Sequence, residues 1–188
     1  MKRLVVVYLL LVLIGCKEKE AAPSDTDYFP AAAYIKSQIA HVDTSVFPII
    51  KIVTRDSVQD TIYIKREQFK NEAKDFLALP DITSKKLKKQ YKETKQYDEA
   101  LQKITFAYHP TEEEEIQQQV VIVKPDPNID KVETIFIDWM KNIDNASVQK
   151  KMTWQANRYF RIITITQKKG QPDKLEKVEV RWIDPSAE

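Results

Sequence analysis

The chain has 188 residues, 43% of them hydrophobic and 31% charged, and its 30 basic and 28 acidic side chains leave a formal net charge of +2. This balanced charge argues against a nucleic-acid-binding protein, which would need basic side chains to neutralise phosphates. The length suits a single domain, and three Trp, eight Tyr and seven Phe are enough for a real hydrophobic core.

The N-terminus has the pattern of a signal peptide. Lys2 and Arg3 supply a positive start, and residues 4–14 form an unbroken apolar run. A helix that crosses a membrane needs about 20 apolar residues, so this run is too short to remain as a permanent span. We therefore predict that residues 1–15 are a signal peptide that is removed on export.

The residues at the predicted cleavage site resemble the lipobox of bacterial lipoproteins. Leu13, Ile14 and Gly15 precede Cys16, and the lipobox places an apolar residue and a small residue before the cysteine that is acylated. The resemblance implies that the thiol of Cys16 receives diacylglycerol and that the mature chain begins there. It covers only the N-terminus, and it makes a membrane the first expected partner.

The residues after Cys16 indicate which membrane holds the lipid. Lys17 occupies the position where an aspartate retains lipoproteins of enteric-type bacteria in the inner membrane, so the resemblance implies the outer membrane. The stretch 17–20 is also similar to the short charged export tag of surface lipoproteins of Bacteroidota. A plain charged tether is the alternative, and both the periplasmic and the surface orientation stay open.

Loss of residues 1–15 changes the chemistry that the chain can carry. Basic and acidic residues then number 28 each, and Gly170 is the only glycine. Phosphate-binding loops, dinucleotide fingerprints and nucleophile elbows all need glycines, so none of them is expected. An acylated Cys16 leaves no thiol for a disulfide, a zinc site or nucleophilic catalysis. We predict no cofactor.

Residues 16–30 have the polar composition of a flexible tether, which would hold a domain on the order of 20 Å from the membrane. Residues 31–188 are predicted to form one domain. Its apolar residues recur at helical spacing over 31–41 and again over 69–77, where Pro80 ends the second helix, and 81–89 suggests a third, short helix.

Strand patterns occupy the remainder of the domain. Residues 48–54 and 61–65 are rich in β-branched side chains and flank a polar turn, which predicts a hairpin. From residue 101 the hydrophobic period is two, and turn residues separate the segments. The strands expected in this meander are 104–108, 120–123, 132–140, 148–154, 159–166 and 175–183.

These elements predict an α+β fold in which a curved antiparallel sheet of about six to eight strands packs against two or three helices. Several strands are apolar on both sides, so we expect helices over one face, while the concave face either keeps an apolar lining or receives the N-terminal segment. The order of elements is similar to that of cone-shaped folds of the nuclear-transport-factor type and of half-barrel lipoprotein carriers. This likeness predicts a cone or half-barrel shape, but a function does not follow from it.

Few residues suggest chemistry. His41 and His109 fall in different elements, and the acidic run 112–115 is typical of a solvated turn, so no metal site is predicted. Asp138 lies in an apolar strand, where burial would raise the pKa of its carboxyl and make it useful for catalysis. The alternative is an aspartate on the solvent side, or one paired with Arg158 or Arg161.

Aromatic residues gather in the C-terminal strands. Trp139, Trp154, Tyr159 and Trp182 could line a ligand pocket or a partner surface together with Asp138, or they could simply form the core.

Three functions are compatible with this sequence. The favoured one is a non-enzymatic binding or assembly module that meets an envelope protein, glycan or lipid. The second is a carrier that holds a lipid or small apolar ligand in the concave face of the sheet. The third is a hydrolase built on scattered carboxylates such as Asp138.

Overall fold

The structure is a computed structural model that describes residues 28–182. The predicted signal peptide, Cys16 with its lipobox, and the tether as far as residue 27 lie outside the described residues. The described part begins at Tyr28, whose hydroxyl donates a hydrogen bond of 2.7 Å to the backbone oxygen of Tyr91. The last residues of the expected tether are therefore held against the domain.

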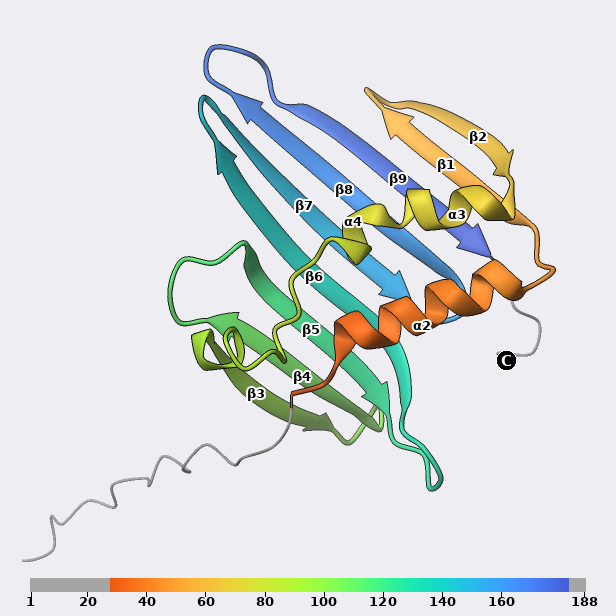
Figure 1. Cartoon of the computed structure of the whole chain (residues 1–188), viewed down its shortest axis with the longest axis vertical. Helices are drawn as coiled ribbons and strands as arrows, with labels where there is room; N and C mark the ends of the chain where they lie inside the picture. Colours follow the sequence, from red (N-terminus) through yellow and green to blue (C-terminus); the bar gives the residue numbers. More distant parts are fainter. Residues whose placement is uncertain (1–27, 183–188) are drawn as a thin grey trace, which may run out of the picture.

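The domain is α+β, as predicted, and contains one antiparallel sheet whose strand order is β2-β1-β9-β8-β7-β6-β5-β4-β3 (Figure 1). A hairpin, β1–β2, joins the last strand of a long meander. The strands are β1 (Ile49–Arg55), β2 (Val58–Ile64), β3 (Tyr91–Asp98), β4 (Lys103–Pro110), β5 (Ile116–Lys124), β6 (Lys131–Ile143), β7 (Ala146–Gln155), β8 (Tyr159–Lys168) and β9 (Lys174–Trp182).

The sheet has nine strands, so the prediction of six to eight was too low. The missed strand is β3, which pairs with β4 along its whole length. Its sequence, YKETKQYD, is largely polar and exposed, so it lacks the apolar alternation that reveals a half-buried strand. The sheet is open, with β2 and β3 as its edges.

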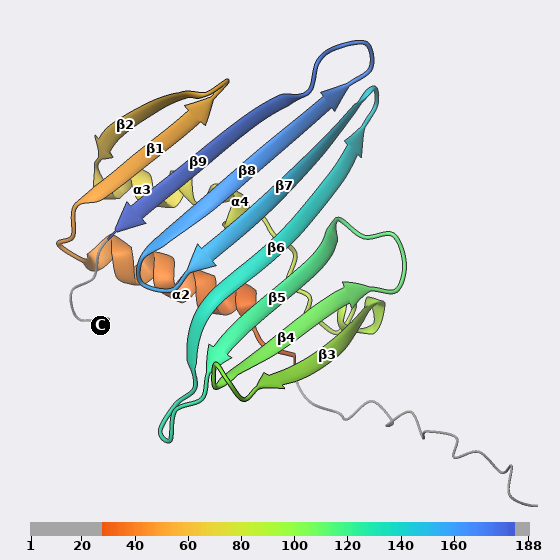
Figure 2. The ribbon, with the colours of Figure 1, turned by 180° about the vertical axis from the view of Figure 1, so that it is seen from behind.

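Helices α2 (Ala31–Thr44), α3 (Arg66–Glu72) and α4 (Lys74–Leu77) all lie on one face of the sheet, as expected (Figures 1 and 2). The predicted second helix is divided into α3 and α4 at Ala73, whose φ of −86° and ψ of 7° leave the α-helical region. The predicted third helix is reduced to turns and the short 3₁₀ helix η1 (Lys88–Gln90), because the Asp81 carboxylate binds the backbone N–H of Thr83 in a turn instead.

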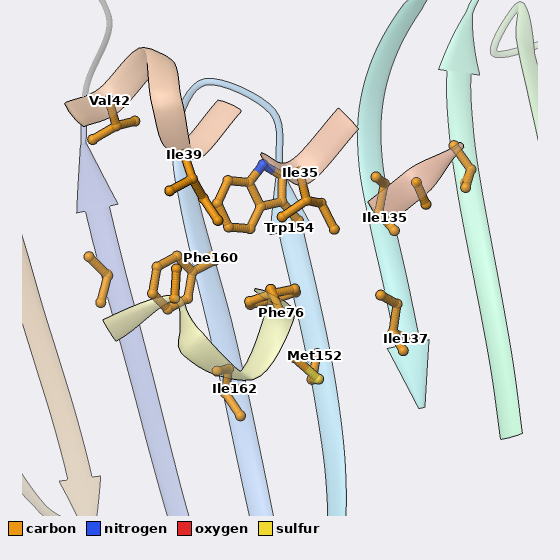
Figure 3. Close-up of a cluster of buried hydrophobic side chains, with 14 of the residues drawn as sticks. Ile35, Ile39, Val42, Phe76, Ile135, Ile137, Met152, Trp154, Phe160 and Ile162 are labelled. Atoms are coloured by element: carbon orange, nitrogen blue, oxygen red, sulfur yellow. The ribbon is translucent and has the colours of Figure 1, made fainter. Parts of the chain in front are cut away.

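The core lies between the helices and the sheet. Figure 3 shows Ile35, Ile39 and Val42 of α2 with Trp154 and Phe160 of the sheet, all of them buried. The rings of Trp154 and Phe160 stack at a centroid distance of 5.5 Å. Burial of side chains this large contributes about 1.5–3 kcal/mol each, so this layer holds the helices on the sheet.

Candidate functional site

Side-chain alternation divides the sheet into a helix face, covered by α2, α3 and α4, and an open face on the opposite side. On β9, Val178, Val180 and Trp182 belong to the core beneath the helices, so Glu179 and Arg181 belong to the open face. Figure 2 views the sheet from the side of the open face, with the helices behind it. In the part of the chain that the structure describes, no helix covers this face.

A cluster of charged side chains lies on the open face toward the end at which β8 begins and β9 ends. Arg161 of β8 is in register with Glu179 of β9, and its Nε and Nη2 atoms each lie 2.7 Å from Oε2 of Glu179. The Nε of Arg181 donates to the other carboxylate oxygen. We call these three side chains, together with Tyr159 and Lys177, the open-face cluster.

Glu179 is buried although it lies on the open face. Its side chain is 3% exposed, while those of Arg161 and Arg181 are 36% and 54% exposed. Burial raises the pKa of the Glu179 carboxyl, but the hydrogen bonds and charges of Arg161 and Arg181 more than offset that effect, so the pKa lies below its ordinary value. At neutral pH Glu179 is therefore an anion that orients two guanidinium groups.

Positive charge predominates on the open face between β6 and β9. Arg161 lies 5.4 Å from the ring centre of Tyr159, which holds the guanidinium against an aromatic surface. Apolar side chains such as Ile52 and Ile163 accompany these charges. The basic residues of these strands on this face include Lys151, Arg161, Lys177 and Arg181, and the acidic ones are Asp138, Glu179 and Glu133, which pairs with Lys103 of β4 over 2.6 Å.

The predicted aromatic surface does not exist as one surface. Trp154 and Trp182 are 0% and 1% exposed and lie in the core, which corrects the prediction that they line a partner surface. Trp139 is on the helix face, where its Nε1 donates to Glu115 over 3.1 Å. Tyr159 alone of the four belongs to the open face. Alternation along each strand sends these residues to opposite sides.

Asp138 is on the open face and is partly buried, in register with Lys151 of β7. This agrees with the simpler of the two expectations, an aspartate on the solvent side. One of its two predicted partners, Arg161, is bound to Glu179 instead. The catalytic hypothesis relies on burial of this carboxyl, and Asp138 is only partly buried.

Within residues 28–182, no three His, Cys, Asp or Glu side chains are grouped closely enough to hold a metal ion. No helix in that range is both long and apolar enough to cross a membrane. A cavity of about 470 Å³ lies beside α2 and has a mostly polar lining that includes Lys124, Lys131 and Glu133.

The sequence analysis missed the open-face cluster. Part of the signal was present, because Glu179 and Arg181 are two residues apart in a predicted strand and so share a face. Arg161 could be added only from the register of β8 against β9, which spacing alone does not give.

Comparison with protein-family models, with curated proteins and with solved structures finds no match for this chain.

Proposed function

We propose that this chain is a lipid-anchored envelope lipoprotein and a non-enzymatic binding or assembly module. In this proposal the open face docks an acidic surface of another envelope protein. The observation that carries it is the open-face cluster, in which a buried carboxylate fixes two arginines on a broad sheet face that the described helices leave uncovered.

The composition of the open face supports an acidic protein as the partner. Arginine and tyrosine are enriched at protein interfaces, and orienting an arginine in advance reduces the entropy lost when it binds. Basic side chains outnumber acidic ones on this part of the open face, which favours a negative partner. The mixture with Ile52, Ile163 and Ile165 suits a protein surface better than a purely charged polymer.

The carrier and hydrolase hypotheses have less support. A carrier needs an apolar cavity, whereas the cavity beside α2 has the polar lining given above and the helix face is filled by the core. The half-barrel shape that a carrier would use stays a prediction. A hydrolase based on Asp138 predicts that Asp138→Asn abolishes the activity and keeps the fold.

The anchor is tested through Cys16. Full-length wild-type protein should fractionate with the outer membrane and carry the mass of a diacylglycerol group, because the thiol of Cys16 is the expected acyl acceptor. Cys16→Ser should remove that mass and release the protein from the membrane after export. A wild-type protein of unmodified mass in the soluble fraction would rule out the anchor.

The docking face is tested by photocrosslinking in the native membrane. A photoreactive residue at Thr153, which is in register with Arg161, should give a discrete adduct with one envelope protein. The same probe at Lys36, an exposed position of α2, is the matched control and should not give that adduct. Adducts from Lys36 with none from Thr153 would place the contact on the helix layer and overturn the proposal.

A further inference from the structure

The two edges of the sheet differ in their protection against pairing with another strand. The outer strand β3 has four charged residues in eight, and the Tyr28 hydroxyl occupies the backbone oxygen of Tyr91 at one end. Charged side chains and covering segments are the usual means by which proteins block an edge. The edge formed by β3 is therefore protected against pairing with another strand.

The edge formed by β2 lacks this protection. Its sequence is VQDTIYI, with Asp60 as its single charge and no lysine or proline. Val58, Ile62 and Tyr63 are exposed to 65%, 53% and 79%. Within residues 28–182, β1 is the only strand beside β2, so its outer backbone groups meet no other strand there. A row of free N–H and C=O groups beside β-branched side chains is a template for strand pairing.

The backbone geometry fixes which groups of β2 face outward. The β1–β2 turn has two residues, 56–57, both with positive φ, and Arg55 pairs with Val58 across it. In such a hairpin the closing pair is hydrogen-bonded, and hydrogen-bonded pairs then alternate along the ladder. The even-numbered residues of β2 therefore bond to β1, and the odd-numbered ones within Gln59–Tyr63 present their backbone groups outward.

We propose that β2 pairs antiparallel with β2 of a second copy of this chain, about a two-fold axis at Thr61. Three outward-facing residues centred on Thr61 match the hydrogen-bonding pattern of this symmetric ladder. The register places Thr61 opposite Thr61, Gln59 opposite Tyr63, and Val58 opposite Ile64. Thr–Thr and β-branched apolar pairs are favourable across antiparallel strands. The proposal is independent of the proposed use of the open face.

The rest of the domain is compatible with this pairing. Asp60 would face Ile62 of the second copy, so no like charges oppose each other. Helix α3 begins just after Ile64, and the two-fold axis places the α3 of the second copy at the opposite end, beyond Val58. The contact is isologous and closes at two copies. In the sheet formed by the two copies, the outermost strand on each side is then the protected β3.

A cysteine at the two-fold axis tests the contact. In a hydrogen-bonded antiparallel pair the Cα atoms are about 5.5 Å apart, which is within reach of a disulfide or a short thiol crosslinker. Thr61→Cys in the full-length protein, in its native membrane, should crosslink to a species of twice the protomer mass. Thr94→Cys, an exposed threonine on the β3 edge, is the matched control and should stay largely uncrosslinked. Unsubstituted protein, with Cys16 only, gives the background.

A charge at the same position provides the second variant. Thr61 is exposed, so Thr61→Lys should leave the protomer folded while placing two ammonium groups opposite each other across the axis. Light scattering of the detergent-solubilised full-length protein should give a dimer for wild type and Thr94→Lys and a monomer for Thr61→Lys. A monomeric wild type, a Thr61→Lys dimer, or crosslinking of Thr61→Cys no stronger than that of Thr94→Cys would overturn the proposal.

Discussion

Glu179 holds the two arginines of the open-face cluster in place. Its carboxylate is buried between Arg161 and Arg181 and has a lowered pKa, so folding is stabilised above the ordinary pKa of a glutamate and loses this contribution as pH falls through the folded pKa. Because both arginines are partly exposed, the contribution is smaller than that of a fully buried pair.

Glu179→Gln should therefore lower the free energy of unfolding by about 1–3 kcal/mol at neutral pH. The difference from wild type should shrink when urea unfolding is repeated at about pH 3, which is below the ordinary pKa of a glutamate, so that part of the carboxylate's contribution has been lost. Glu99→Gln, on the exposed β3–β4 loop, is the control and should change the stability little. An equal loss from Glu179→Gln at both pH values would mean that the carboxylate charge is not the cause.

At the residue scale, sequence spacing gave the faces of single strands but not the neighbours across strands. In the predicted strand 175–183, Val178, Val180 and Trp182 alternate with charged residues, which puts them on one face, and the structure places all three in or against the core. The pairing of Arg161 with Glu179 depends on strand register, which is set by turns and core packing together. Trp154 and Tyr159 were grouped because they are near in sequence, although alternation places them on opposite faces.

At the scale of elements, the helix layer depends on a few aromatic contacts. Phe76 of the four-residue helix α4 meets Trp154 and Phe160 edge-on at centroid distances of 5.1 Å and 5.5 Å. Such a short helix has little stability of its own, so it depends on this packing.

Phe76→Ala should lower the free energy of unfolding by about 3–5 kcal/mol, since it removes a buried ring and leaves a cavity. Ile129→Ala, at a side chain that is 78% exposed, should change it by less than about 0.5 kcal/mol. Urea unfolding monitored by tryptophan fluorescence measures both. Similar losses for the two variants would show that α4 does not hold the core together.

Elements with strong periodicity were predictable, and those defined by tertiary contacts were not. The spacing of Ile35, Ile39 and Val42 identified α2, which the structure confirms. Strand β3 has no such period, because an edge strand buries few side chains, and only its partner β4 defines it. The break at Ala73 was equally invisible, since alanine favours a continuous helix.

At the scale of the molecule, the sequence predicted the class, α+β with helices on one face. It did not predict which strands far apart in the chain pair with each other. The last strand, β9, pairs with the early strand β1 and so joins the hairpin to the meander, a contact between segments far apart in the chain. Local patterns carry no information on such pairing. It nevertheless builds the open face, because Ile52 of β1 is in register with Glu179.

The central claim is that an acidic partner docks on the open face of a membrane-anchored domain. The most direct measurement is the yield of the Thr153 crosslink in two charge-reversal variants of one strand. Lys177→Glu changes the open face, whereas Lys174→Glu changes the same strand on the opposite side. The account predicts a large loss of adduct for Lys177→Glu and none for Lys174→Glu. Equal yields from both variants would contradict it.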